Sequence, residues 1–252
     1  GSTAIVTYHS NNVYNNSFTA SSGTSSCIIY GYYNFGSPTV ENIYNNNIYD
    51  LSVAGTNTGT SSLLNGMHTN TTSTATKTIY GNNIYNFSAL SGNVNGIAQF
   101  LGTNVQIYKN NIYNLSNATT VTTAATMCGI TINSGIVYAY NNFISDLRTP
   151  LSASVDGIRG INITSTTSAS TVGLYYNTIF LNASSTGANF GTTGIYHTYS
   201  ATATTAALDM RNNIIVNNST PVGSGLIVAF RRSAATSLLN YGSASNNNSF
   251  YA

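Results

Sequence analysis

The motif Asn46-Asn47-Ile48-Tyr49 recurs along the whole chain and indicates its architecture. The copies, the last four of them weaker, are Asn11-Asn12-Val13-Tyr14, Asn46-Asn47-Ile48-Tyr49, Asn82-Asn83-Ile84-Tyr85, Asn110-Asn111-Ile112-Tyr113, Asn141-Asn142-Phe143-Ile144, Asn177-Thr178-Ile179-Phe180, Asn212-Asn213-Ile214-Ile215 and Asn248-Ser249-Phe250-Tyr251. The second polar residue falls at positions 12, 47, 83, 111, 142, 178, 213 and 249, so successive copies are 28 to 36 residues apart. A fixed period in this range indicates stacked structural repeats.

Two further elements recur between these copies. The first is a glycine followed by an aliphatic residue, with Cys27-Ile28 as a first member that lacks the glycine. Its other members are Gly66-Met67, Gly96-Ile97, Gly129-Ile130, Gly157-Ile158, Gly194-Ile195 and Gly225-Leu226. The second is a short run before the asparagines, as in Ile43-Tyr44, Ile79-Tyr80, Ile107-Tyr108 and Leu174-Tyr175. Each repeat thus holds three short β-rich runs. One repeat cannot bury its own apolar face, so we expect the copies to stack around a continuous core.

Alternation along the copies assigns side chains to the inside or the outside of a coil. The inward column is predicted to be Val13, Ile48, Ile84, Ile112, Phe143, Ile179, Ile214 and Phe250. The outward column is predicted to be Tyr14, Tyr49, Tyr85, Tyr113, Ile144, Phe180, Ile215 and Tyr251. The asparagine pair suits a tight turn, because asparagine tolerates left-handed backbone and its amide can bond to the asparagine of the next coil.

These motifs resemble the pectin-lyase-like superfamily of right-handed parallel β-helices, over residues 6 to 251. The resemblance implies an all-β solenoid with three parallel sheets and asparagine-ladder turns. We expect about seven or eight coils, which form a single domain over residues 1–252. The same fold carries lyases, hydrolases, adhesins and inert spacers, so fold alone does not define activity.

The ends of the chain differ from the enzymes of that superfamily, which carry a helical cap. The repeat pattern begins at Ile5-Val6-Thr7-Tyr8 and stops at Phe250-Tyr251. Uncapped coils expose core and strand edges. We therefore expect this chain to be a segment of a longer protein, with end-to-end or lateral self-association as the alternative.

Composition excludes several partners. The chain has 7 basic and 5 acidic residues and a net charge of +2, too few cations for a nucleic-acid site. No apolar run approaches the roughly 18 residues that a membrane span needs. The 2 cysteines, Cys27 and Cys128, do not form a disulfide framework, and we expect both to be free and buried. They lie on equivalent elements three coils apart, a gap of about 14 Å at ~4.8 Å per coil.

The most site-like stretch is Asp156-Gly157-Ile158-Arg159, on the sheet that carries the cleft in related enzymes. Asp156 and Arg159 are therefore the candidate catalytic residues. The outward positions two residues after each glycine read His68, Ala98, Thr131, Arg159, Tyr196 and Ile227. The alternative is a solvent-facing Arg159 that merely pairs with Asp156. The other acidic residues are scattered, and no metal-ligand spacing or cofactor motif is present.

A stripe of aromatic residues is the second candidate site. Tyr49, Tyr85 and Tyr113 are predicted to face outward and, with Arg159 and Tyr196, to be ligand-binding residues. In-register aromatic rings also stabilise a solenoid by roughly 0.5 to 1.5 kcal/mol per pair. The stripe could therefore be structural, or it could contact a polysaccharide or another protein surface.

The sequence favours a non-enzymatic, extracellular or cell-surface module that acts as a stalk or adhesin, or that binds a surface or carbohydrate. The low charge, the repetition and the scattered acids all support this hypothesis. Two alternatives are a polysaccharide-active enzyme, lyase or glycosidase, and a self-assembling extracellular fibre subunit. No cofactor is expected for any of the three.

Overall fold

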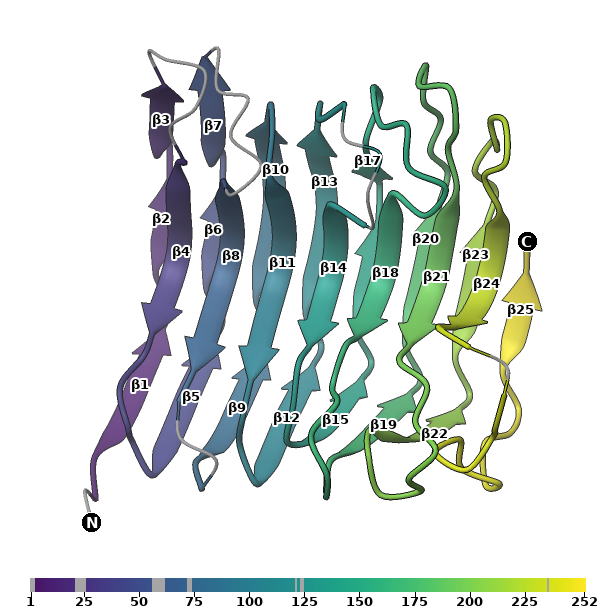
Figure 1. Ribbon diagram of the computed structural model, residues 1–252. Coiled ribbons are helices and arrows are strands. Elements are labelled where there is room, and N and C mark those ends of the chain that lie inside the picture. Colours follow the sequence, from purple (N-terminus) through teal and green to yellow (C-terminus); the bar gives the residue numbers. More distant parts are fainter. Residues whose placement is uncertain are drawn as a thin grey trace.

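The computed structural model describes residues 3–20, 26–55, 62–71, 74–120, 122, 125–234 and 236–252, which form a parallel β-solenoid of about 7 turns. All regular structure in these ranges is β-strand, as the sequence predicts. Figure 1 shows the coils stacked side by side from the N-terminal to the C-terminal end of the chain, with strands of all three sheets in every complete coil. No helix among the described residues is long and apolar enough to cross a membrane.

Three sheets run along the solenoid. Sheet A contains β1 (Ile5–His9), β5 (Val40–Tyr44), β9 (Thr76–Tyr80), β12 (Asn104–Tyr108), β15 (Ile136–Tyr140), β19 (Thr171–Tyr175) and β22 (Ala207–Arg211). Sheet B contains β2 (Asn12–Tyr14), β6 (Asn47–Tyr49), β10 (Asn83–Ala89), β13 (Asn111–Asn117), β16 (Phe143–Ser145), β20 (Thr178–Leu181), β23 (Ile214–Asn217) and β25 (Ser249–Tyr251), together with β3 (Ser17–Ala20), β7 (Ser52–Gly55) and β17 (Leu147–Arg148). Sheet C contains β4 (Ile28–Asn34), β8 (Leu63–Asn70), β11 (Asn93–Phe100), β14 (Met127–Ile132), β18 (Ile158–Ile163), β21 (Thr192–His197) and β24 (Ile227–Arg232).

A buried asparagine ladder joins the coils at the turn from sheet A to sheet B. Its members are Asn11, Asn46, Asn82, Asn110, Asn142, Asn177, Asn213 and Asn248, and the side-chain bonds between successive members are 2.8 to 3.0 Å long. In Asn82, for example, Nδ2 donates to Oδ1 of Asn110 at 2.9 Å and to the carbonyl oxygen of Ile43 at 3.1 Å. Each amide inside the ladder is thus satisfied without water, which a buried polar column requires.

The residue before each ladder asparagine lies in the left-handed backbone region. These residues are Ser10, Asn45, Gly81, Lys109, Asn141, Tyr176, Asn212 and Asn247, with φ between 51° and 63°. Asparagine and glycine occupy five of the eight positions, in keeping with their low cost in this conformation. The turn therefore has one geometry in every coil, and that shared geometry aligns the ladder.

The predicted columns are wrong in two coils. Asn142 and Asn213 are ladder members, so the strand that follows each is shifted by one residue against the sequence alignment. Phe143 and Ile214 face outward, 43% and 50% exposed, whereas Ile144 and Ile215 are fully buried. The cause is that Asn141 and Asn212 occupy the left-handed turn position. In these two copies the first asparagine occupies the turn and the second joins the ladder. In the other copies the first asparagine joins the ladder and the residue after it begins the strand.

The glycine column on sheet C also differs from the prediction at three places. The strand pairing aligns Gly31, Gly66, Gly96, Gly129, Gly160 and Gly194, with Ala229 in the last coil. Gly157-Ile158 lies three residues too early, and Gly225-Leu226 and Cys27-Ile28 each lie four residues too early. The stretch Gly157-Ile158-Arg159-Gly160-Ile161 contains two glycine–isoleucine pairs, and only the second enters the strand register.

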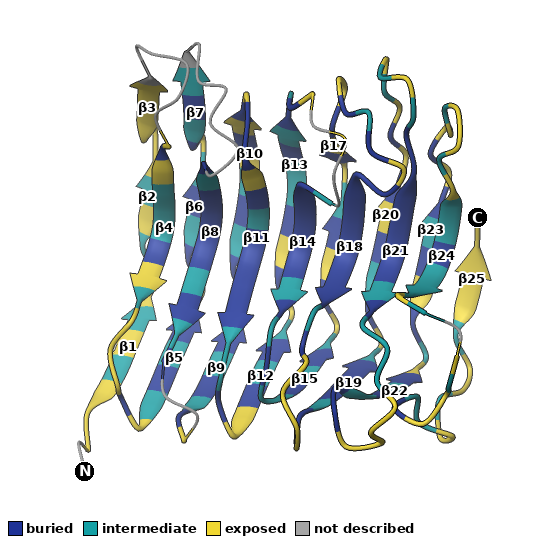
Figure 2. Ribbon diagram, viewed as in Figure 1, coloured by how far each residue is buried: buried dark blue, intermediate teal, exposed yellow. Residues whose placement is uncertain are grey.

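The core is apolar in the central coils, where the isoleucine column of sheet B packs against sheet C. Figure 2 shows that burial is greatest in the middle of the solenoid and falls towards its two ends. Cys27 and Cys128 are both buried and form no disulfide bond, as predicted, and they lie three coils apart at sheet C.

Two charged residues also lie inside. Glu41 and Lys77 are register neighbours on β5 and β9 and are 0% and 1% exposed. Glu41 accepts hydrogen bonds from Tyr32 and Asn34, at 2.8 and 2.7 Å. Burial lowers the pKa of Lys77 to about 8, partly opposed by the charge of Glu41. The residues that align with Lys77 in later coils are apolar, so the repeat pattern of the sequence did not indicate the two buried charges.

Candidate functional site: a trough on sheet C

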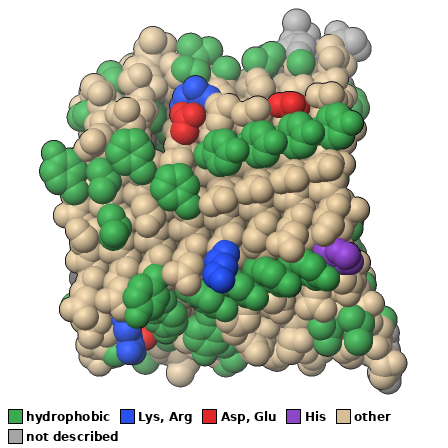
Figure 3. Space-filling view, turned by 180° about the vertical axis from the view of Figure 1, so that it is seen from behind, with side chains coloured by type: hydrophobic (Ala, Val, Ile, Leu, Met, Phe, Trp, Pro, Cys, Tyr) green, Lys and Arg blue, Asp and Glu red, His purple; other side chains and the backbone are tan. Residues whose placement is uncertain are grey.

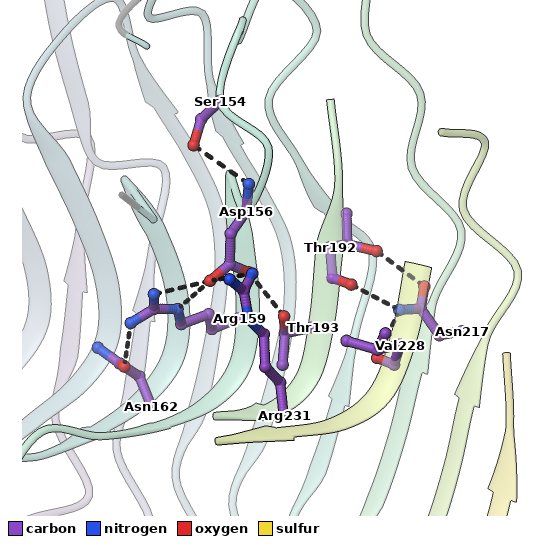
Figure 4. A network of polar contacts seen from close by, with 9 residues as sticks. All are labelled: Ser154, Asp156, Arg159, Asn162, Thr192, Thr193, Asn217, Val228 and Arg231. Carbon is purple, nitrogen blue, oxygen red and sulfur yellow. Dashed lines mark hydrogen bonds and ion pairs between the residues drawn. The ribbon is translucent and has the colours of Figure 1, made fainter. Parts of the chain in front are cut away.

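The Asp156–Arg159 pair predicted from the sequence is present, and it is buried, not solvent-facing. Asp156 and Arg159 are 4% and 8% exposed. Oδ2 of Asp156 accepts from Nε and Nη2 of Arg159 at 2.9 and 2.7 Å, and Oδ1 accepts from Thr193 Oγ1 at 2.6 Å. Arg231 lies 3.5 Å from the same carboxylate. Figure 4 shows these side chains converging on Asp156 from three neighbouring strands.

This network leaves neither carboxylate oxygen of Asp156 free for a substrate. It links the segment before β18 to β18, β21 and β24, and so fastens three coils together. A buried ion pair keeps its place only when its remaining hydrogen bonds are also made, which is the case here. The arrangement therefore indicates a structural role for Asp156 more than acid–base chemistry.

Arg159 also contacts Tyr196, but the two do not belong to one column. Strand pairing aligns Arg159 with Thr193, and Asn162 with Tyr196. The guanidinium carbon of Arg159 lies 3.4 Å from the centre of the Tyr196 ring, and Nη1 donates to Asn162 at 2.9 Å. Arg159 and Tyr196 thus form one end of the outer surface of sheet C, whereas Tyr49, Tyr85 and Tyr113 lie on sheet B. The predicted site residues fall on two separate surfaces.

A trough of about 260 Å³ lies on sheet C beside this network. It crosses β8, β11, β14 and β18, and its lining comprises Leu63, Asn65, His68, Asn93, Asn95, Ala98, Phe100, Ala125, Thr126, Cys128, Thr131 and Asn162. Most of the polar groups belong to two outward columns, on either side of the glycine column. One contains Asn65 and Asn95, and the other contains His68, Thr131 and Asn162. A site that spans four coils is shaped for an elongated ligand.

Two aromatic side chains, His68 and Phe100, line the trough, and Tyr30 and Tyr33 pack against His68. The ring of His68 lies 4.9 Å from that of Phe100, 5.1 Å from that of Tyr30 and 5.3 Å from that of Tyr33. All four rings belong to the first three strands of sheet C. Their packing holds His68 in one orientation at the edge of the polar floor.

A chain of hydrogen bonds crosses the floor. Thr131 donates to Asn95 at 2.8 Å, Asn95 donates to Asn65 at 2.8 Å, and Asn65 Nδ2 lies 3.0 Å from Nδ1 of His68. Because an amide nitrogen only donates, Nδ1 of His68 must accept, and the proton of the neutral ring is on Nε2. Burial, and then the charge of Lys77, lower the pKa of His68. His68 therefore presents a neutral N–H donor at physiological pH.

Two further groups complete the floor. Burial raises the pKa of the Cys128 thiol to about 11, so the sulfur is protonated and is not a nucleophile at neutral pH. Thr126 is 5% exposed, and its hydroxyl has no hydrogen-bond partner among the described residues. The described chain contains no group of three or more His, Cys, Asp or Glu residues that could hold a metal. The trough is neutral and rich in hydrogen-bonding groups.

Sequence reasoning found His68 and Thr131 as outward positions but missed the trough. The motif Asn-Gly precedes the aliphatic residue in two consecutive coils, at Asn65-Gly66 and Asn95-Gly96. Two in-register asparagines on an outer sheet surface were a usable indication of a polar floor. Asn162 could not be found, because the glycine register of its coil was taken from Gly157 instead of Gly160.

The tyrosines of sheet B stack on one another as predicted. The ring centres of Tyr14, Tyr49, Tyr85 and Tyr113 are 5.0 to 5.1 Å apart in sequence order, and neighbouring planes differ by 1° to 5°. Each inner ring is therefore stacked on both of its faces by the neighbouring rings. Such rings stabilise the coils and cannot offer a flat face to a sugar.

No protein-family model matches the chain, and comparison with curated proteins and with solved structures found no significant match. The fold and the site thus define the protein as an all-β parallel solenoid with an open polar trough.

Proposed function

We propose that the chain is a non-enzymatic module of a secreted or cell-surface protein, and that the sheet C trough binds a neutral carbohydrate chain. The observation that carries the proposal is the combination of an amide and hydroxyl floor with an aromatic wall. Sugar hydroxyl groups need donors and acceptors together, and sugar C–H groups pack against aromatic rings. Asn65, Asn95, Thr131 and His68 supply both kinds of contact.

The extent of the trough favours a chain over a single sugar. The lining residues come from four successive strands of sheet C. A ligand aligned with the solenoid axis would meet one asparagine, threonine or histidine from each coil. Such an open, extended surface suits a polymer, whereas small ligands are usually enclosed by a deeper pocket.

The state of Asp156 supports binding over catalysis. Glycosidase chemistry needs two carboxyl groups placed around one bond. Asp156 is held by Arg159, Thr193 and Arg231, and Asp146 pairs with Arg148 at 3.3 Å. Kinship with the pectin-lyase-like superfamily and an extracellular location are parts of the same proposal.

A glycan array followed by calorimetry with the best ligand tests this proposal. His68→Ala and Asn95→Ala should each weaken binding at least about tenfold, because each removes a wall or floor group. The matched control Asn104→Ala alters an exposed asparagine on sheet A and should bind as the unaltered protein does. Absence of any glycan ligand, or equal binding by all three variants, would overturn the trough assignment. Release of new reducing ends from the ligand would overturn the non-enzymatic part.

A further inference from the structure

A second periodic surface lies on the other side of the coil, where sheets A and B meet. Two rows of stacked tyrosines border it. The sheet B row is Tyr14, Tyr49, Tyr85 and Tyr113, and the sheet A row is Tyr44, Tyr80, Tyr108 and Tyr140. Figure 3 shows two rows of hydrophobic side chains crossing this side, with a band of polar side chains and backbone between them. We call this surface the tyrosine–asparagine face.

The two rows have nearly the same pitch. Ring centres in the sheet A row are 4.8 to 4.9 Å apart, with planes within 8° of parallel. Those in the sheet B row are 5.0 to 5.1 Å apart. Since the ring faces are used within each row, what reaches solvent is the ring edge and the phenol group. Each row is a line of hydroxyl groups with one member per coil.

A second, exposed asparagine ladder lies between the rows. Asn47 donates to Asn12 at 2.9 Å, Asn83 to Asn47 at 2.9 Å, and Asn111 to Asn83 at 3.0 Å. Each inner amide spends one N–H and one oxygen lone pair on these bonds. One N–H and one lone pair per amide are left to face solvent. The second, third and fourth coils therefore present the same three groups, two phenols and an amide.

The face carries little charge. Lys109 lies at the turn of the fourth coil and His9 at the start of the sheet A row, where its ring stacks on Tyr44 at 4.8 Å. Asp50 and Asp146 lie on the far side of the sheet B row, one residue after the outward position. A surface that is neutral and periodic cannot compensate the charge of an acidic polymer. Its partner must be neutral and must repeat with the same step.

We propose that the tyrosine–asparagine face binds a neutral, extended, β-1,4-linked polysaccharide that lies along the solenoid axis, with one sugar residue over each coil. One residue of such a chain advances by nearly the same length as one coil. Its hydroxyl groups exchange hydrogen bonds with the phenols and amides, and the ring edges pack against its C–H groups. The contacts are individually weak, so affinity accumulates over the three coils in which all three columns are present.

The dependence of affinity on ligand length tests this proposal. Cello-oligosaccharides of two to six residues are titrated into the protein by calorimetry. Affinity should rise steeply up to three residues, with the hexasaccharide at least about tenfold tighter than the disaccharide. Affinity that does not change with length, or no heat at millimolar hexasaccharide, would overturn the proposal.

Variants locate the binding on this face. Tyr49→Ser/Tyr85→Ser should weaken hexasaccharide binding at least about tenfold. Asn111→Glu adds a charge to the exposed ladder without touching a ring, and should have the same effect as the tyrosine variant if the fold is intact. Tyr176→Ser is the matched control, because Tyr176 is 59% exposed and lies outside both rows. Sedimentation that shows dimers lost in the tyrosine variant would overturn the proposal in favour of self-docking.

Discussion

Gly96 on sheet C lies directly against Ile112 on sheet B, so that a Cβ atom on Gly96 would fall 2.6 Å from Cγ2 of Ile112. The carbonyl oxygen of Gly129 in the next coil would be 2.6 Å away as well. The same contact recurs along the solenoid, as between Gly160 and Ile179. A glycine column on one sheet and an isoleucine column on another thus set the thickness of every coil.

Gly96→Ala should destabilise the protein by about 1 to 3 kcal/mol, because neither the isoleucine nor the backbone of the next coil can withdraw freely. Urea denaturation followed by circular dichroism measures the loss. Gly36→Ala is the control, since Gly36 lies in an exposed loop near a flexible side chain. A loss at Gly96 no larger than that at Gly36 would mean that the sheets are less closely packed.

Neighbouring residues in the fifth coil test the corrected register. Ile144→Ala should cost about 2 to 5 kcal/mol, as truncation of a fully buried aliphatic side chain does. Phe143→Ala should cost less than about 1 kcal/mol, because its side chain faces solvent. Ile144 is 0% and Phe143 43% exposed. The reverse order of the two unfolding free energies would restore the alignment expected from the sequence.

The buried ladder should be far more sensitive than the exposed one. Asn110→Ala removes the acceptor of two N–H groups of Asn82 and the donor to the carbonyl oxygen of Ile79. Each buried group left without a partner costs about 1 to 3 kcal/mol. Asn111→Ala loses one exposed bond to Asn83 and should cost less than about 1 kcal/mol. Equal melting temperatures for the two variants would contradict the ladder assignment.

Acid should destabilise the C-terminal coils through His197. Its ring is 0% exposed, and burial lowers its pKa to about 4. The unfolded chain takes up the same proton near pH 6.5, so it gains protons before the folded chain does as the pH falls. Stability contributed by neutral His197 is therefore present above about pH 6.5 and is lost towards pH 4, by up to roughly 3 kcal/mol.

His197→Ile is the matched variant for this prediction, because Ile132 and Ile163 occupy the same register position in preceding coils. Unfolding free energies between about pH 7 and pH 4.5 should fall less steeply for this variant than for the unaltered protein. Parallel curves would show that His197 does not titrate differently in the folded and unfolded chains.

The proximity of Asp156 and Arg159 was predictable, because they are three residues apart, with Asp156 just before β18 and Arg159 within it. Their burial was not. It depends on Thr193 and Arg231, which reach Asp156 from the next two coils, 37 and 75 positions along the chain. The trough arises in the same way, since Asn65, Asn95 and Thr131 are neighbours only after the coils stack.

By itself the sequence determined the period, the three β-runs of each repeat and the asparagine turn, because alternation and turn chemistry are local properties. Only the tertiary structure decided which asparagine of Asn141-Asn142 and Asn212-Asn213 enters the ladder. The two residues of each pair are chemically identical, and the choice follows from a left-handed turn that must match the coils on both sides.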